Sequence, residues 1–225
     1  MVISPRRYVS KATKPRKENK VGRTHDFFLA LLVRMITLYG ISSSRASRNM
    51  WMLNELALDY ENILVSDRNG ETRNPEFIKL NPNGKVPLLV DGETRLFESI
   101  AINLHLANKY KGDLWYEDMD SQGTVMQWSI WAMTEIEPPL VAMLEEKMFA
   151  EEPDQARIAA AEEQIKQPLT VLNDTMVGRD WLIGDAFSIA DLNVASVLSL
   201  AGLVQFSVSE YANVDRWANA AWSRP

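Results

Sequence analysis

Two kinds of hydrophobic pattern follow one another along the chain. In the first half, short apolar runs bounded by turn residues predict four β-strands, at residues 36–39, 63–65, 86–90 and 96–97. Between them, apolar residues three and four positions apart predict helices over about 50–60, 76–80 and 99–109. A helical crossover makes the first two strands parallel, and a turn at Asp91 and Gly92 makes the last two antiparallel. This order fits a mixed four-stranded sheet between helices.

The second half of the chain predicts helices only. Apolar faces at helical spacing run over residues 121–133, 140–149, 154–176, 190–203 and 213–222. Pro138 and Pro139 are expected to break or kink one helix and Pro168 to kink another, because proline has no N–H to donate. Ser188 followed by Asp191 is typical of a capping box, and the helix that follows is apolar nearly all round. We therefore expect that helix to be the buried centre of the second half.

These patterns divide the chain into a basic extension over residues 1–34, an α/β domain over 35–112 and an all-helical domain over 121–225. The extension holds nine Lys and Arg against two acidic residues, a net charge of +7, whereas the rest of the chain carries −13. A strand pattern begins directly after Met35, so we expect the extension to be extraneous or disordered, with a mitochondrial-type presequence or a nucleic-acid arm as alternatives. The acidic body repels phosphate, which argues against a nucleic-acid partner.

Residue counts exclude several classes of protein. The 225 residues include no cysteine, which removes disulfide scaffolds, thiolate metal sites and cysteine nucleophiles. The two histidines, His25 and His105, are too few to favour a histidine metal site or a Ser-His-Asp hydrolase. No window approaches the roughly 18 uninterrupted apolar residues of a membrane span, so no membrane partner is expected. The chain stops at Pro225 without an obvious end signal, which is typical of a truncated C-terminus.

Four sequence motifs follow one another at specific spacings. They are ITLYG at 36–40 with SSSRASR at 42–48, NPNGKVPLL at 81–89, LFESIAI at 96–102 and WLIGDAFSIADL at 181–192. In this order the chain resembles the glutathione transferase family over about residues 36–224, and within it the cytosolic, bacterial-type members with a serine-type active site. The resemblance implies a thioredoxin-like N-terminal domain followed by an all-helical C-terminal domain.

The resemblance also implies how glutathione is bound. It implies a cis peptide before Pro87, which frees the Val86 backbone to pair with the cysteinyl part of glutathione. Glu98 and Ser99 match the family pair that holds the γ-glutamyl end. Ser99 would stand at a helix N-terminus, where amides and dipole favour a carboxylate, and Glu98 offers a negative partner for the ammonium. Lys85 matches a position that often contacts the glutathione backbone and would complement the glycyl carboxylate.

The glutathione thiol needs an activating residue. A thiol has a reference pKa near 8.5, so lowering it by ~2 units requires ~2.7 kcal/mol, which one hydroxyl donor plus a helix N-terminus can supply. The family places a Tyr, Ser or Cys at the start of its first helix, and this chain has no Cys. Anchored on Arg48, Ser44 falls on the serine position. Ser43 is the nearest rival, with Ser42 behind it, and Tyr39 fits a core aromatic better than an activating residue.

These implications predict a glutathione transferase that conjugates the glutathione thiolate to an electrophilic, hydrophobic second substrate. Detoxification in the cytoplasm is the expected role, glutathione the co-substrate, a homodimer the expected assembly, and no metal is expected. Trp128, Trp131 and Glu135 are expected to edge the second-substrate pocket. Two alternatives stay open: glutathione-dependent disulfide or peroxide reduction, which can use two glutathiones, and a non-catalytic module for protein interaction. The intact Lys85-to-Ser99 motifs argue against the last.

Overall fold

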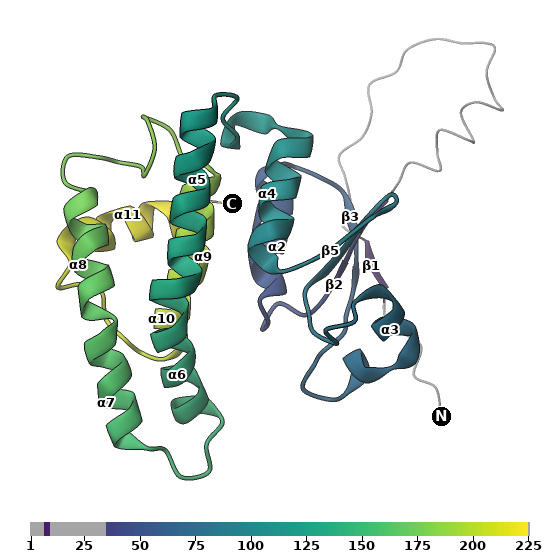
Figure 1. The fold of residues 1–225 in the computed structure, drawn as a ribbon, viewed down its shortest axis with the longest axis horizontal. Coiled ribbons are helices and arrows are strands. Elements are labelled where there is room, and N and C mark those ends of the chain that lie inside the picture. Colours follow the sequence, from purple (N-terminus) through teal and green to yellow (C-terminus); the bar gives the residue numbers. More distant parts are fainter. Residues whose placement is uncertain (1–6, 10–34, 225) are drawn as a thin grey trace. The chain divides into compact units, whose positions relative to one another are not determined.

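The computed structural model describes residues 7–9 and 35–224 of the chain (Figure 1). The chain divides into two compact units, Met1–Leu106 and Ala107–Pro225, which we call unit 1 and unit 2. Unit 1 contains a sheet and helices, whereas the described elements of unit 2 are all helical, so the predicted fold class is confirmed. Within the described ranges, no helix is long and apolar enough to cross a membrane.

The sheet of unit 1 has five strands in the order β1-β3-β2-β4-β5. Their bounds are Arg7–Val9 for β1, Ile36–Tyr39 for β2, Tyr60–Ile63 for β3, Leu88–Asp91 for β4 and Thr94–Phe97 for β5. β2 is parallel to β3, and β4 is antiparallel to both β2 and β5, as the sequence predicts. β1 comes from the basic extension and pairs antiparallel with β3. Residues 1–6 and 10–34 lie outside the described residues, so the nature of the extension stays a prediction.

β3 begins earlier than the apolar run at residues 63–65 predicts. The side-chain amide of Asn62 explains this, because it donates to the carbonyls of Leu38 at 2.9 Å and Gly40 at 3.1 Å. These bonds tie β3 to the end of β2 in addition to the backbone ladder. A polar residue thus helps to fix the pairing of the strand, which a hydrophobic pattern does not reveal.

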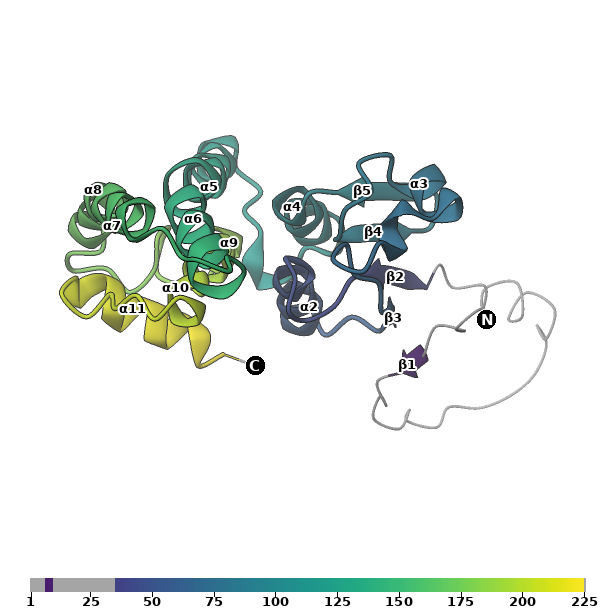
Figure 2. The same ribbon diagram turned by 90° about the horizontal axis from the view of Figure 1, so that it is seen from below.

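The helices of unit 1 lie on both sides of its sheet. α2 (Ala46–Glu55) and α4 (Ser99–Tyr110) share one side, and α3 (Pro75–Leu80) lies on the other (Figures 1 and 2). A short 3₁₀ turn, η1 (Glu71–Arg73), precedes α3. Fully buried apolar side chains from the strands and from α2 and α4 form the core: Leu38, Leu88, Leu89, Met52, Leu53, Ile102 and Leu106. The sheet therefore presents the N-terminal ends of α2 and α4 on a rigid support.

Unit 2 is built around α9 (Ile189–Leu198), all of whose residues are buried. The other described elements are η2 (Gly112–Leu114), α5 (Met119–Trp131), the π-helical η3 (Ala132–Ile136), α6 (Glu137–Met148), α7 (Gln155–Gln164), α8 (Lys166–Thr175), α10 (Leu200–Leu203) and α11 (Ala212–Trp222). The prediction of a buried central helix is confirmed, because an apolar surface on every side requires partners on every side.

A capping box begins α9, as the sequence predicts. Ser188 and Asp191 satisfy each other's backbone N–H groups across the first turn. The Asp191 carboxylate also accepts from Leu182 N at 2.8 Å and from Trp217 Nε1 at 2.9 Å. Burial raises the pKa of Asp191, and these donors oppose that rise. Asp191 thus connects the start of α9 with the preceding loop and with α11, which is a structural role.

The prolines of unit 2 are accommodated in two ways. η3 directly precedes Pro138 and Pro139, which lie in the first turn of α6. These two prolines have no N–H to donate to a helical hydrogen bond. The wide turn of η3 accommodates the missing bonds, so the expected break in the helix is a π-helical turn. The long helix predicted over 154–176 divides at Ile165, in the turn before Pro168, where a proline interrupts the helical bonds. Pro168 lies in the first turn of α8, where a helix requires no donated N–H.

Candidate functional site

The chain turns tightly where β2 meets α2. Gly40 has a φ of +143°, and a Cβ at this position would lie 2.5 Å from the Cβ of Ala46, so only glycine fits. The same point lies 3.5 Å from both Ser44 Oγ and Val86 Cβ. This junction therefore brings together two residues that the sequence predicts for the site, Ser44 and Val86.

Ser44 is half-buried in the turn before α2. Its hydroxyl donates to the carbonyl of Ile41 at 2.7 Å and accepts from the backbone N–H of Ala46 at 3.2 Å. The Ile41 carbonyl also accepts from Ser44 N at 3.0 Å, so it keeps a partner if the hydroxyl turns away. Because Ala46 is the first residue of α2, the Ser44 oxygen lies at the positive end of the helix dipole. This is a suitable place to stabilise an anion.

The rivals of Ser44 differ from it in their surroundings. Ser42 and Ser43 are exposed in the same turn. Tyr39 is half-buried and packs edge-to-face on Phe77, with ring centroids 6.0 Å apart. Burial and the nearby Glu61 raise the pKa of Tyr39, against a smaller opposite effect of Arg95, so its phenol stays neutral at pH 7. These contacts support the interpretation of Tyr39 as a core aromatic.

The loop before the cis peptide is held by a buried asparagine. Asn81 is only 1% exposed, and its amide donates to the carbonyl of Lys85 at 2.7 Å while its Oδ1 accepts from Asn83 N at 3.0 Å. The Val86–Pro87 peptide is cis, as the family resemblance implies. The Val86 side chain belongs to a buried apolar cluster, while Lys85 is exposed. Asn81 therefore fixes the backbone that presents Lys85 and Val86.

Glu98 and Ser99 lie at the start of α4. Glu98 is exposed and has a φ of +71°, which is uncommon for a residue with a β-carbon. Its carbonyl accepts the first helical bond from Ile102 N at 3.0 Å, and Ser99 is the first residue of the helix. Strained backbone of this kind is concentrated at ligand sites. Ser99 is 2% exposed, and its position at the helix N-terminus is as predicted.

A buried polar network joins α2 to α4. Arg48 Nη1 donates to Ser99 Oγ at 3.3 Å, and Asn49 Nδ2 donates to the Ser99 carbonyl at 2.8 Å and to Asn103 Oδ1 at 2.7 Å. All four residues are buried. Since Arg48 follows Ser44 by four residues on the same chain segment, this network fixes α4, and with it Ser99, relative to the turn that carries Ser44.

The sequence assigned no role to Asn81, Asn49 or Asn103, although the structure places all three beside the predicted residues. The sequence contains an indication for two of these residues: Asn49 and Asn103 lie on the apolar faces of their helices, and both are buried. Buried polar side chains are hydrogen-bonded, so a polar residue on an apolar face indicates a partner on another element. The pattern does not show which element supplies it.

The residues predicted for the second substrate lie in unit 2. Trp128 is buried and contacts Trp131 edge-to-face, with centroids 5.0 Å apart, and Glu135 is exposed in η3. Among the residues that the structure describes, no group of three His, Cys, Asp or Glu side chains could hold a metal ion. His105, expected on the surface or in packing, is half-buried, and its Nε2 lies 3.1 Å from the buried Asp91 carboxylate.

Comparison with known proteins identifies the family. The model of the glutathione S-transferase N-terminal domain matches residues 34–108, and that of the C-terminal domain matches residues 130–225. Glutathione S-transferase 4 of Zea mays is 31% identical over 200 residues, which cover 84% of this chain and 89% of the relative. The chain belongs to the glutathione S-transferase family. It is therefore a glutathione transferase enzyme with a thioredoxin-like N-terminal domain, in a family for which glutathione is the co-substrate.

Two further relatives of this transferase come from bacteria. Glutathione S-transferase GstB of Escherichia coli (strain K12) is 30% identical over 197 residues, which cover 85% of this chain and 95% of the relative. A glutathione transferase from Burkholderia graminis, solved with two glutathione molecules bound per subunit, is 31% identical with a TM-score of 0.78. The alignment covers 85% of each chain.

Proposed function

We propose that unit 1 of this transferase binds glutathione along the N-terminal ends of α2 and α4. The observation that carries the proposal is the meeting of Ser44 and Val86 at Gly40, with Ser99 bonded to Arg48 on the same helix that follows Ser44. The Val86 backbone pairs with the cysteinyl part of the peptide, which brings the thiol to the turn before α2.

The two ends of glutathione meet groups of opposite charge. The γ-glutamyl carboxylate lies at the first turn of α4, where free N–H groups and the dipole favour an anion. Arg48 donates to Ser99 Oγ, so the single hydroxyl proton of Ser99 stays available for that carboxylate. Glu98 is the negative partner of the ammonium. Lys85 complements the glycyl carboxylate, and because it is exposed the pair contributes about 0–1 kcal/mol.

Ser44 stabilises the thiolate by one hydrogen bond. Its proton bonds to the Ile41 carbonyl, and a thiolate is a stronger acceptor because it is charged. The exchange leaves no buried carbonyl without a partner, since Ser44 N continues to donate to Ile41 O. The N–H of Ala46 remains bonded to Ser44 Oγ and polarises it. The hydroxyl and the helix dipole together lower the pKa of the bound thiol.

The reaction that we propose is conjugation to an electrophilic, hydrophobic second substrate. The thiolate sulfur forms a bond to an electrophilic carbon. With an aryl halide, the halide leaves as an anion. With an epoxide, the C–O bond breaks and the alkoxide oxygen takes a proton from water. The enzyme contributes positioning and charge stabilisation and forms no covalent intermediate. Trp128, Trp131 and Glu135 remain our candidates for contacts with this substrate.

A turnover panel tests this proposal. The protein is incubated with glutathione and, in turn, with an aryl halide, an epoxide, a peroxide and a mixed disulfide, and the products are identified by mass. We expect a thioether product from the aryl halide or the epoxide. Turnover of none of the four, with glutathione still bound in calorimetry, would instead support the non-catalytic interaction module.

Glutathione-dependent reduction is the second candidate, and two observations favour it. The chain has no cysteine, so reduction of a disulfide would use glutathione for both thiols, and the Burkholderia graminis relative binds two glutathione molecules per subunit. With a disulfide, one thiolate displaces a thiol and forms a mixed disulfide, which the second glutathione converts to oxidised glutathione and a second thiol. With a hydroperoxide, attack of the thiolate on oxygen releases an alcohol and leaves glutathione sulfenic acid, which the second glutathione converts to oxidised glutathione and water. In the panel this activity gives oxidised glutathione and no thioether.

The assembly and the compartment belong to the same proposal. α5 carries three exposed apolar side chains along one face, Met119, Met126 and Ile130, at 83%, 49% and 62% exposure. A homodimer would cover this stripe, since a two-fold interface pairs one patch with its own copy.

We place the enzyme in the cytoplasm, because conjugation consumes reduced glutathione and that compartment maintains it.

A further inference from the structure

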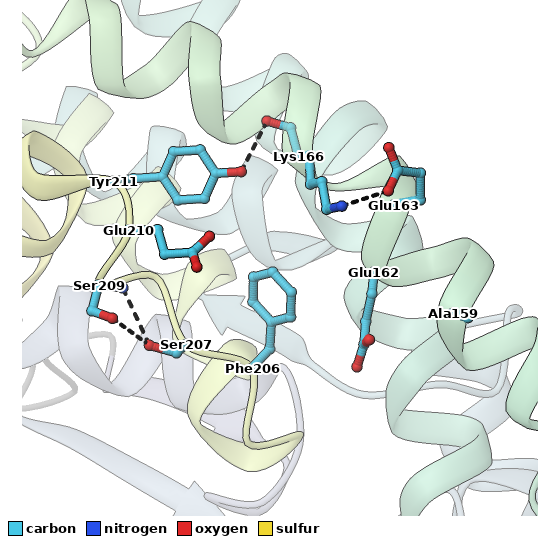
Figure 3. A pocket seen from close by; sticks show the side chains of 9 residues that line it. All are labelled: Ala159, Glu162, Glu163, Lys166, Phe206, Ser207, Ser209, Glu210 and Tyr211. Carbon is cyan, nitrogen blue, oxygen red and sulfur yellow. Dashed lines mark hydrogen bonds and ion pairs between the residues drawn. The ribbon is translucent and has the colours of Figure 1, made fainter.

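Unit 2 contains a pocket that the glutathione proposal does not use. It has a volume of about 360 Å³ and lies between α7, the start of α8 and the loop that joins α10 to α11 (Figure 3). Pockets for small ligands begin at about 300 Å³. Phe206 and Tyr211, both half-buried, supply aromatic walls, and Figure 3 shows the Glu210 carboxylate between their two rings.

Hydrogen bonds to α6 and α8 hold the loop that forms one wall of this pocket. The loop is fixed before Phe206 by Lys147, whose Nζ donates to the Val204 carbonyl at 3.0 Å. It is fixed after Tyr211 by Asn213, whose backbone N–H donates to Asn173 Oδ1 on α8 at 3.0 Å. The loop between these points therefore keeps its shape, and a ligand would not have to order it.

The α10 end of the loop is a closed turn. The N–H of Phe206 donates to the Ala201 carbonyl at 2.9 Å, and the N–H of Gln205 donates to Gly202 at 3.3 Å, which is the Schellman pattern. Gln205 takes the left-handed position with a φ of +54°, where glycine is usual. Further along, Ser207 and Ser209 bond to each other at 2.9 Å. Phe206 is thus presented from a defined turn.

The charge on the pocket is negative. Three carboxylates and one ammonium line it, and two of the carboxylates are paired: Glu162 with Lys147 at 3.2 Å and Glu163 with Lys166 at 2.5 Å. For Glu210 the described part of the chain provides no hydrogen bond or ion pair of this kind. Its charge acts on the Lys166 ammonium only at longer range, and more weakly than that of Glu163.

We propose that this pocket binds a small organic cation, with an alkylammonium head between the Phe206 and Tyr211 rings and against the Glu210 carboxylate. An aromatic face attracts a cation through its quadrupole, and the adjacent carboxylate adds a formal charge. Two rings beside a carboxylate that takes part in no close ion pair fit an alkylated ammonium, which offers both apolar surface and charge.

Other occupants fit the same features poorly. A second glutathione is an anion at pH 7, and the excess of carboxylates would repel it. A bare metal ion needs three or more close ligands, and the described residues hold no such group. The proposal stands apart from the glutathione site, because every residue that carries it belongs to unit 2.

The test uses choline and its uncharged isostere 3,3-dimethylbutan-1-ol, titrated into the full-length protein and followed by calorimetry or ligand-observed NMR. We expect saturable binding of choline, and binding of the alcohol at least tenfold weaker, because only the cation interacts with the rings and with Glu210. Glu210→Gln should weaken choline about tenfold, which corresponds to about 1.4 kcal/mol. Phe206→Leu, which keeps apolar bulk, should weaken it by several-fold.

Two controls make the result specific. Glu151→Gln removes another exposed carboxylate, outside the pocket, and should leave choline binding unchanged. Tyr211→Phe keeps the ring and should change binding little. Equal affinity for choline and the alcohol, equal loss in Glu151→Gln and Glu210→Gln, or no saturable binding by about 10 mM would each overturn the proposal. Glutathione turnover of Glu210→Gln should match that of the wild type.

Discussion

Glu98 provides a test in which stability and binding are expected to move in opposite directions. The residue has a φ of +71° directly before α4, and it is our partner for the ammonium of glutathione. Glycine adopts this conformation as readily as a negative φ, whereas a residue with a β-carbon does not. Glu98→Gly should therefore relieve strain while it removes the negative charge.

The magnitudes follow from the geometry. A left-handed residue with a β-carbon costs about 1–2 kcal/mol, and part of the gain is lost because glycine also makes the unfolded chain more flexible. Glu98→Gly should then raise the unfolding free energy by about 0.5–1 kcal/mol, or Tm by roughly 1–4 °C. Glu98 is exposed like Lys85, so loss of its charge should cost about 0–1 kcal/mol of glutathione binding. Glutathione affinity should fall by up to about fivefold.

The assay combines thermal unfolding with calorimetric titration of glutathione. Glu98→Ala keeps a β-carbon, so it should lose affinity like Glu98→Gly without the gain in Tm. Gln205→Gly is a matched control, because Gln205 has a φ of +54° in unit 2 and should gain stability with unchanged glutathione binding. Equal Tm values for Glu98→Gly and Glu98→Ala would refute the strain argument. Unchanged affinity in both variants would remove Glu98 from the glutathione site.

The remaining predictions concern the network between the helices and the basic extension. Asn49→Ala removes one donor from the Ser99 carbonyl and one from Asn103 Oδ1, so it should lower the unfolding free energy by about 1–3 kcal/mol in urea denaturation. Asn54→Ala, on the exposed face of α2, should cost under about 0.5 kcal/mol, and a similar cost for both would contradict the network. A chain that starts at Met35 should fold, dimerise and turn over like the full chain, because β1 is an edge strand and its removal leaves β2 to β5 paired with one another. A large loss of Tm on this truncation would show that the extension belongs to the fold.

The sequence predicts most of the fold because its signals are local and repeated. The strand at 36–39, the turn at Asp91 and Gly92 and the capping box of Ser188 and Asp191 depend on residues close in the chain, and the structure has each of them. The start of β3 was misplaced because its pairing depends on the side chain of Asn62, which bonds to residues more than twenty positions earlier. Pro168 predicts the interruption of the long helix, and the structure has it at Ile165 because Pro168 offers no N–H to the carbonyl of Gln164, four residues earlier.

The sequence likewise predicts the residues of the candidate site but not all of their contacts. Family motifs point to Ser44, Val86, Glu98 and Ser99, and the geometry around Gly40 places the first two together. The motifs do not show that the Ser44 hydroxyl donates to the carbonyl of Ile41. That bond depends on backbone geometry of the turn, which sequence spacing does not determine.

The pKa of the glutathione thiol bound to this enzyme tests the central claim most directly. It is read from the ultraviolet absorbance of the thiolate, titrated against pH in the wild type and in Ser44→Ala. We expect the wild-type complex to titrate about two units below the free value near 8.5, and Ser44→Ala to titrate one to two units higher than the wild type. A loss of the cap contact costs only about 1 kcal/mol, so the variant should fold. Equal titration of the two complexes, with the shift appearing instead in Ser43→Ala or Tyr39→Phe, would contradict the assignment of Ser44.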